Sequence, residues 1–202
     1  MLHVRALHRP GLAPLDLDLA EGEALAVLGP SGSGKTLLLR AIADLDPNDG
    51  EVRLNGESRE GMSGPAWRRL VTYLAAEPGW WAERAADHFP DPAAAEAVFP
   101  ALNLPAKVMG QPVSELSTGE RHRLALTRVL VQSPQVMLLD EPTSGLDGDA
   151  VRAVEAALGE RLAAGAALIF STHDEEQARR LARHRLRMSN GQARAETTEA
   201  AR

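Results

Sequence analysis

Residues 29–36, GPSGSGKT, constrain the fold of this chain more than any other segment. They follow a short continuous apolar run (ALAVL, residues 24–28) and precede LLLRAIADL, whose apolar residues recur at helical spacing. The glycines let successive backbone N–H groups turn inward around phosphate oxygens, and the following helix adds its positive N-terminus. A strand, a glycine-rich loop and a helix in this order predict an α/β fold that binds a nucleoside triphosphate.

The end of this segment supplies two reactive side chains. Only Lys35 and Lys107 are lysines among the 22 basic residues, and the others are arginines. A lysine at position 35 therefore departs from the strong preference of this chain for arginine. A compact ammonium at Lys35 can reach the β- and γ-phosphates, and the Thr36 hydroxyl can ligate Mg²⁺. A chance Gly-Ser turn is the alternative, which the flanking strand and helix disfavour. The predicted nucleotide-binding residues here are Gly29, Pro30, Ser31, Gly32, Ser33, Gly34, Lys35, Thr36 and Leu37.

A second candidate site lies where an apolar run meets acidic residues, in VMLLDEPTSGLD. Asp140 and Glu141 stand at the C-terminal end of this predicted buried strand, where α/β sheets place ligands. Asp140 suits the Mg²⁺ shell, and Glu141 can polarise an attacking water. The alternative is that these acidic residues only cap the next helix. The presence of a phosphate loop in the same chain makes this alternative less favoured.

Composition limits the class of protein. No apolar run approaches the ~20 residues that cross a bilayer, and the N-terminus lacks the apolar core of a secretory signal. The chain has no Cys, which excludes disulfides and thiolate metal sites. A net charge of −6 argues against nucleic acid as a partner. We therefore expect a cytoplasmic protein.

The remaining patterns give the order of elements. Alternation in LHVRAL and LDLDLAEG predicts two short strands, and EVRLNG predicts another. Residues 136–140 and 166–171 are apolar on both faces, as in buried parallel strands, with a helix over about 148–164 between them. A charged helix near 174–183 and a strand near 184–189 follow. The Arg-rich EEQARRLARHRLR fits a solvated helix face better than a binding patch.

Five motifs in order resemble those of ATP-binding cassette (ABC) nucleotide-binding domains. Besides the phosphate loop and the acidic strand, LSTGE at 116–120 resembles the LSGGQ signature, SGLD at 144–147 the D-loop, and STHD at 171–174 the H-loop. The resemblance covers residues 29–174 and is to compact, single-cassette ATP-binding subunits. It implies a P-loop NTPase (RecA-like) α/β core with an N-terminal antiparallel β subdomain and a short inserted α-helical subdomain. The whole chain would form one domain. Its nucleotide-binding core with the β subdomain would comprise about 1–76 and 134–194. The helical signature lobe would comprise about 77–133, and a disordered tail about 195–202.

The resemblance also implies a mechanism that needs two cassettes. Each ATP would be held between the phosphate loop of one copy and the signature of another, in a head-to-tail homodimer or with a paralogous cassette. His173 would contact the γ-phosphate and help hold Glu141 and the water, and Asp147 would connect the two sites. Glu141, His173 and Lys35 are thus the predicted catalytic residues. The predicted signature contacts to ATP are Ser117, Thr118, Gly119 and Glu120.

Three features depart from the family pattern. No aromatic residue precedes Trp67 to stack on adenine, which leaves His8 or Arg9 as candidates. Thr118 and Glu120 replace a Gly and a Gln of the signature. Ala76 stands where relatives have a Gln that touches Mg²⁺ or water, and we expect the neighbouring Glu77 to replace it in part as a metal ligand.

The resemblance implies an ATPase subunit of a transporter, which drives a separate transmembrane permease from the inner face of the cell membrane. In YLAAEPGWW, residues 73–81, Trp80 and Trp81 lie where a permease would dock, and packing inside the lobe is an equally good interpretation. The alternative function is a soluble ABC ATPase of the cofactor-assembly type. A third, a degenerate nucleotide-gated subunit, is favoured only by Ala76 and opposed by the intact Lys35, Asp140, Glu141 and His173.

Overall fold

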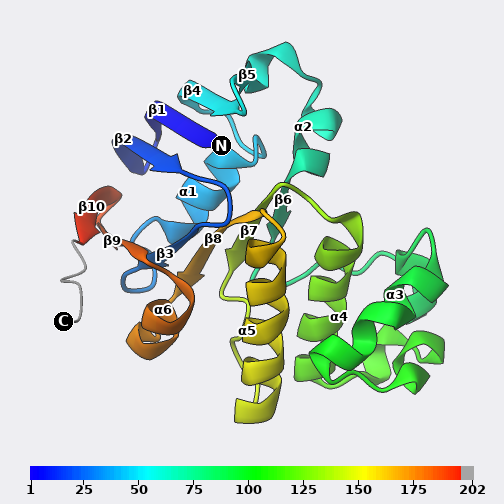
Figure 1. Ribbon diagram of the computed structural model, residues 1–202. Helices are drawn as coiled ribbons and strands as arrows, with labels where there is room; N and C mark the ends of the chain where they lie inside the picture. Colours follow the sequence, from blue (N-terminus) through cyan, green and yellow to red (C-terminus); the bar gives the residue numbers. More distant parts are fainter. Residues whose placement is uncertain (197–202) are drawn as a thin grey trace.

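The computed structural model describes residues 1–196, and two β-sheets with helices around them organise this part of the chain (Figure 1). The smaller sheet is antiparallel, with strand order β2-β1-β4-β5. Leu2, Val4 and Leu7 point into the core and exposed residues stand between them, which is the alternation of a half-buried sheet. This sheet consists of β1 (Leu2–Arg9), β2 (Leu12–Leu19), β4 (Asp49–Leu54) and β5 (Glu57–Ser58). The predicted N-terminal antiparallel subdomain is therefore confirmed.

The larger sheet has the order β10-β9-β3-β8-β7-β6, and its neighbours are parallel except for the β9–β10 pair. Every residue of β3, β7 and β8 is buried, which explains why these segments are continuously apolar. The strands are β3 (Ala24–Leu28), β6 (Val71–Leu74), β7 (Val136–Asp140), β8 (Ala167–Thr172), β9 (His184–Ser189) and β10 (Gln192–Glu196). The carboxyl ends of the parallel strands share one edge, and that edge carries the site described below.

Among residues 1–196, six α-helices surround the sheets: α1 (Lys35–Ile42), α2 (Gly64–Leu70), α3 (Pro92–Val98), α4 (Thr118–Gln132), α5 (Gly148–Ala163) and α6 (Glu175–Leu181). One buried cluster joins the small sheet, α1 and one face of the large sheet. A second cluster joins the opposite face to α4, α5 and the inserted segment. Trp67 on α2 is fully buried and its indole N–H donates to the Ile42 carbonyl at 2.9 Å, which ties α2 to the end of α1.

The inserted segment between β6 and α4 is built from short helical turns around α3. Four 3₁₀ helices lie here: η2 (Ala85–His88), η3 (Phe99–Leu102), η4 (Ala106–Gly110) and η5 (Val113–Glu115); a fifth, η1 (Arg59–Gly61), precedes α2. Phe99, Leu102 and Val108 are buried and bring the segment into the same cluster as α4. The domain boundaries inferred from the sequence stay a prediction, although the helical character of this segment agrees with them.

The expectation of a disordered tail from about residue 195 is wrong at Ala195 and Glu196. Both belong to β10, where Ala195 pairs with Leu186 and Glu196 with Arg185. An edge strand held by backbone hydrogen bonds needs no apolar pattern, so hydropathy gave no signal. The rest of the predicted tail, 197–202, lies outside the described residues.

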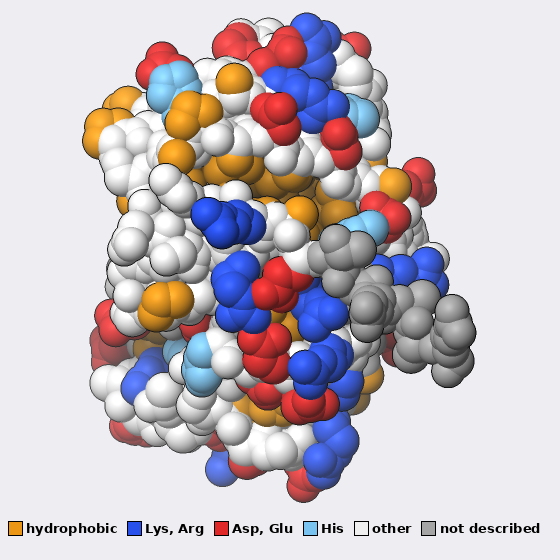
Figure 2. Space-filling view, turned by 90° about the vertical axis from the view of Figure 1, so that its left-hand side faces the viewer, with side chains coloured by type: hydrophobic (Ala, Val, Ile, Leu, Met, Phe, Trp, Pro, Cys, Tyr) orange, Lys and Arg blue, Asp and Glu red, His pale blue; other side chains and the backbone are white. Residues whose placement is uncertain are grey.

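The face that carries α6 and β10 shows basic and acidic side chains interspersed (Figure 2). Arg187 contacts both Glu175 on α6 and Glu196 on β10, and Arg180 pairs with Glu155 of α5. The Arg-rich segment singled out in the sequence is thus a charged, solvent-facing surface, as predicted.

Candidate nucleotide-binding site

The loop between β3 and α1 turns so tightly that some of its positions have room only for glycine. Gly29 has φ 147°, and a Cβ there would lie 2.4 Å from the Met188 carbonyl oxygen and 2.8 Å from Ser33 Oγ. Gly34, with φ 106°, is the residue before the first turn of α1. Only glycine adopts such values freely. The backbone therefore turns tightly onto the N-terminus of α1, as a phosphate-binding loop requires.

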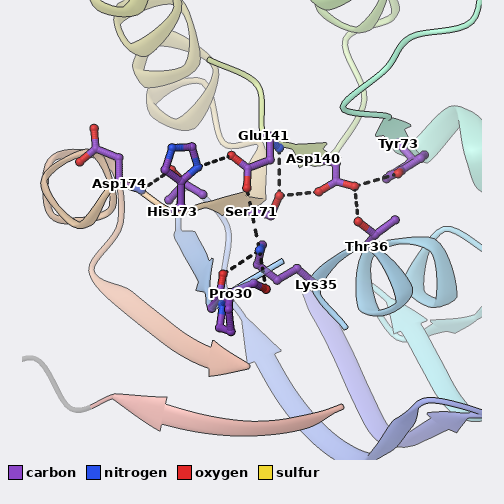
Figure 3. Close-up of polar contacts among 11 residues, drawn as sticks. Pro30, Lys35, Thr36, Tyr73, Asp140, Glu141, Ser171, His173 and Asp174 are labelled. Atoms are coloured by element: carbon purple, nitrogen blue, oxygen red, sulfur yellow. Dashed lines mark hydrogen bonds and ion pairs between the residues drawn. The ribbon is translucent and has the colours of Figure 1, made fainter. Parts of the chain in front are cut away.

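Lys35 lies back over this loop. Its Nζ donates to the carbonyl oxygens of Gly29 at 2.8 Å and Pro30 at 3.3 Å, and lies 3.9 Å from Glu141 Oε1 (Figure 3). The side chain is only 10% exposed. The ammonium is therefore held between the loop and the acidic end of β7.

Asp140, at the end of β7, is the centre of a hydrogen-bonded cluster (Figure 3). Thr36 Oγ1 donates to its Oδ2 at 2.6 Å, Tyr73 donates its hydroxyl to the same oxygen at 3.2 Å, and Ser171 donates to Oδ1. The carboxylate is 4% exposed. Burial, together with the neighbouring carboxylate of Asp140, raises the pKa of the Tyr73 hydroxyl far above its ordinary value, so this hydroxyl remains a donor.

Glu141 follows Asp140 with a left-handed backbone, φ 50°, which costs about 1 kcal/mol in a residue other than glycine. Its N–H donates to Ser171 Oγ at 2.9 Å, which helps to hold this conformation. Its Oε2 lies 3.0 Å from His173 Nδ1, while the His173 side chain is 76% exposed. One carboxylate oxygen thus faces an imidazole and the other faces Lys35, the arrangement of a base that positions a water.

Lys35, Thr36, Asp140 and Glu141 border one hollow of about 280 Å³, which His173 does not line. Its lining consists of residues 31–37, Ala76, Asp140 and Glu141. Glu77 is exposed and does not line the hollow, whereas the Ala76 methyl does. The structure therefore does not bring Glu77 to Asp140, and it gives no support to Glu77 as a metal ligand.

The residues present fit Mg²⁺ at one point of this hollow. The Thr36 hydroxyl and the Asp140 carboxylate are hard oxygen donors, and the short hydrogen bond between them shows that both reach the same position. Mg²⁺ beside a nucleotide takes few protein ligands and keeps waters and phosphate oxygens around it. Two such groups, rather than a cluster of carboxylates, are what a nucleotide-bound Mg²⁺ requires.

The predicted signature residues lie elsewhere. Ser117 caps α4 and forms a capping box with Glu120: Ser117 Oγ accepts from the Glu120 N–H at 3.2 Å, and Glu120 Oε2 accepts from the Ser117 N–H at 2.9 Å. The backbone N–H of Ser117 lowers the pKa of Glu120. A Cβ on Gly119 would lie 3.4 Å from Leu146. The signature, including Thr118, packs beside residues 144–146 and does not line the hollow.

The remaining predicted contacts are also outside the hollow. Asp147 caps α5 by accepting from the Ala150 N–H at 2.9 Å. His8 Nδ1 lies 2.9 Å from the Ala6 carbonyl oxygen, and Arg9 is paired with Asp46. Neither His8 nor Arg9 lines the hollow, so the structure does not identify the group that stacks on a base.

Sequence reasoning missed two residues of the site, Ser171 and Tyr73. Ser171 pairs in register with Asp140 across the β7–β8 ladder, which places its hydroxyl between the Asp140 carboxylate and the Glu141 N–H. The signal in the sequence was a polar residue, Ser171, at the end of a predicted buried strand. Tyr73 sits on β6, the other neighbour of β7.

A second concave surface, which we call the lobe groove, lies between β6, α4 and the inserted segment. It has a volume of about 520 Å³ and is lined by Arg69, Thr72, Tyr73, Leu74, Trp81, His88, Phe89, Pro90, Asp91, Ala125, Arg128, Val129, Val131 and Gln132. Trp81 is 70% exposed, whereas Trp80 packs against the core of the lobe. Packing inside the lobe therefore applies to Trp80, whereas Trp81 is exposed on the surface of the groove.

Both tryptophans contact one cation. The Arg128 guanidinium lies 4.5 Å from the Trp80 ring centre and 4.9 Å from that of Trp81. His88 packs edge-on against both rings, and Arg128 donates to the Gly79 carbonyl at 3.1 Å. Burial lowers the pKa of Arg128. These contacts fix the segment after β6 onto α4.

Comparisons with known proteins agree with this geometry. Residues 12–144 match a family described as ABC transporter. The chain is 34% identical to the Fe(3+) ions import ATP-binding protein FbpC of Mesorhizobium japonicum, over 88% of this chain and 54% of that protein. It is 33% identical to the phosphate import ATP-binding protein PstB 2 of Natronomonas pharaonis, over 90% of this chain and 72% of that protein. The chain thus spans about half of the length of the first of these relatives.

Solved structures have the same fold. The ATP-binding subunit of an ABC transporter superimposes with a TM-score of 0.86 at 23% identity, covering 98% of this chain and 90% of that one. A dimeric ATP-binding cassette in a post-hydrolysis state with ADP and Pi also gives 0.86, at 21% identity and with complete coverage of both chains. The P-loop α/β architecture with an antiparallel subdomain and a helical insertion is confirmed.

Proposed function

The chain belongs to the ABC transporter family, and on that premise we propose that it is the ATP-binding and ATP-hydrolysing subunit of a membrane transporter. The observation that carries this proposal is the convergence of Lys35, Thr36, Asp140 and Glu141 on one hollow at the end of the phosphate loop, with His173 in contact with Glu141. Phosphoryl transfer to water is mainly a matter of positioning and charge stabilisation, and these groups supply both.

The proposed reaction assigns one task to each group. The N–H groups of the loop and the N-terminus of α1 hold the phosphates, and Lys35 leaves its loop carbonyls to bind the β- and γ-phosphates. Glu141 orients the attacking water and accepts its proton, and His173 holds Glu141 and contacts the γ-phosphate. Thr36 and Asp140 would hold Mg²⁺, which neutralises charge on the phosphate oxygens when bound.

The position of the signature supports a dimer. Ser117, Thr118, Gly119 and Glu120 lie outside the hollow of their own chain, at the N-terminus of α4. We propose that they complete the hollow of a second cassette packed head to tail, either another copy or a paralogue, with Asp147 between the two sites. One of the structural neighbours is itself a dimer.

The membrane partner is a separate permease. No helix among residues 1–196 is long and apolar enough to span a bilayer, and the relatives are named as the ATP-binding proteins of import systems. That naming favours transport over cofactor assembly. We propose that the chain works at the cytoplasmic face of the cell membrane and that a cytoplasmic segment of the permease occupies the lobe groove. Arg69, Arg128 and the exposed Trp81 suit an amphipathic segment with an acidic residue.

The test is the Glu141→Gln variant, which keeps the shape of the side chain and removes its negative charge. We expect ATP hydrolysis to fall about hundredfold or more while ATP binding persists, so that the variant elutes as a dimer with ATP and Mg²⁺ in size-exclusion chromatography. Glu77→Gln is the matched control and should behave as the wild type. Undiminished hydrolysis in Glu141→Gln would remove Glu141 from its proposed role, and absence of ATP binding by the wild type would remove the function itself.

A further inference from the structure

Tyr73 lines the lobe groove and reaches the nucleotide hollow only through its hydroxyl, without lining that hollow. It lines the lobe groove, and its hydroxyl donates to Asp140 Oδ2 at 3.2 Å inside the cluster at the nucleotide hollow. Figure 3 shows the ring on β6 with its hydroxyl directed at Asp140. The side chain is half-buried, so one end is held by the cluster while part of it faces the groove.

The Tyr73–Asp140 bond is a side-chain hydrogen bond that joins the lining of the lobe groove to the lining of the nucleotide hollow, in addition to the backbone ladder between β6 and β7. The chain that continues from β6 runs past the hollow at Ala76, whose methyl group cannot bond to a carboxylate, a metal or a water. The next side chain, Glu77, is exposed. Tyr73 therefore supplies a side-chain polar contact between the two surfaces, at a place where Ala76 and Glu77 supply none.

The oxygen that Tyr73 contacts is the one that matters for metal binding. Asp140 Oδ2 accepts from both Thr36 and Tyr73, and Asp140 Oδ1 accepts from Ser171. When Thr36 turns its hydroxyl to a ligand in the hollow, the Tyr73 and Ser171 bonds remain to fix the carboxylate plane. Hydrogen bonds of this kind to a metal-holding carboxylate are worth about tenfold or more in metal affinity.

We propose that Tyr73 is a positioning residue that couples the lobe groove to the nucleotide site, so that a segment seated in the groove changes how Asp140 and Thr36 hold Mg²⁺ and ATP. The inference rests on the proposed function and adds to it the route by which the partner regulates the site. A segment that displaces the ring draws the hydroxyl from Asp140 and loosens the carboxylate. By linkage, a nucleotide that fixes Asp140 also changes the affinity of the groove for its occupant.

Tyr73 is the only tyrosine in the chain, which makes a direct test possible. Incorporation of 3-fluorotyrosine gives a single fluorine NMR resonance at this position. The protein carries Glu141→Gln to prevent turnover, and the groove probe is 1-anilinonaphthalene-8-sulfonate, an apolar anion that suits a groove with two arginines. We expect the resonance to move when Mg²⁺ is added to the ATP-bound protein and to move again when the dye is added. If the resonance shifts with Mg²⁺ alone or with the dye alone, the proposal is overturned.

The Tyr73→Phe variant tests the hydroxyl. It keeps the ring, and we expect the tightening of ATP binding by Mg²⁺, measured as the ratio of the two dissociation constants with Mg²⁺ and with EDTA, to fall about tenfold. The dissociation constant of the dye should then no longer depend on Mg²⁺ and ATP. Thr127→Val is the matched control, because its hydroxyl on α4 donates to the Arg123 carbonyl at 3.0 Å, and Thr127 lines neither the lobe groove nor the nucleotide hollow.

The outcomes separate this inference from the proposed function. If the wild type does not bind ATP, the proposed function fails and the inference fails with it. If the wild type binds ATP with Mg²⁺ and Tyr73→Phe equals Thr127→Val in both ratios, only the inference fails. Thermal unfolding followed by circular dichroism shows whether Tyr73→Phe is folded; if it is not, the fluorine measurement, which keeps the hydroxyl, decides.

Discussion

Asp46 offers a prediction whose size follows from the structure. Its carboxylate accepts two hydrogen bonds from Arg40, each 2.7 Å long, and pairs with Arg9 as well. Arg40 is on α1 and Arg9 ends β1, so Asp46 joins the phosphate-loop helix to the small sheet. The Arg40 hydrogen bonds, helped by Arg9, lower the pKa of Asp46 from 3.8 to about 2.

A lowered pKa stabilises the folded state wherever the carboxyl is ionised. A difference of about two pKa units corresponds to ~2–3 kcal/mol at neutral pH, and solvent screening of a partly exposed group reduces this to about 1–2 kcal/mol. The contribution is present in full above the unfolded pKa and is lost as the pH falls through the folded pKa, between about pH 4 and pH 2. Asp46→Asn should therefore lower Tm at pH 7 by roughly 2–8 °C for a chain of this size.

The assay is thermal unfolding followed by circular dichroism at pH 7 and at pH 3, with Asp49→Asn as the control. The Asp49 side chain is 81% exposed, so its replacement should change Tm by less than about 1–2 °C. The difference between Asp46→Asn and the wild type should shrink at pH 3. The reasoning is refuted if the two variants have the same Tm at pH 7, or if the Asp46→Asn deficit is unchanged at pH 3.

Three further variants test single features of the site. Gly29→Ala puts a Cβ 2.4 Å from the Met188 carbonyl oxygen, and we expect it to lower stability by about 1–3 kcal/mol in urea unfolding and to abolish ATP binding in calorimetry. Glu120→Ala removes half of the capping box and should lower stability by about 1 kcal/mol, with a larger loss of ATPase rate in the dimer than of ATP affinity in the monomer. Glu77→Ala should leave the ATPase rate within about twofold of the wild type, because Glu77 does not line the hollow; a greater loss would restore it as a ligand.

The sequence was most informative where backbone conformation and chemistry impose the same residues. The phosphate loop needs Gly29 at a position where a Cβ collides, and the buried strands β7 and β8 need apolar residues on both faces, so both features were visible as patterns. Helix α2 was not predicted, although Ser63 as cap and Pro65 in the first turn mark its start.

Contacts between strands distant in the sequence were beyond prediction. Tyr73 and Asp140 are 67 residues apart, and their contact depends on β6 lying beside β7 in register. The displacement of Glu77 from the hollow likewise depends on the direction of the chain after β6, which no residue pattern specifies. Patterns predicted the elements and the chemistry, while the sheet order decided which side chains meet.

Arg128 contacts the rings of both Trp80 and Trp81 and so ties α4 to the segment after β6. The helix has 15 residues and is therefore about 22 Å long, with the signature at its first turn and Arg128 near the other end. A force on Trp81 in the lobe groove would pass through Arg128 to this helix, whose first turn carries the signature. Tyr73, in the same groove, donates to Asp140 at the nucleotide hollow of its own chain. One occupant of the groove would therefore act on two places at once, the start of α4 and the carboxylate beside the hollow.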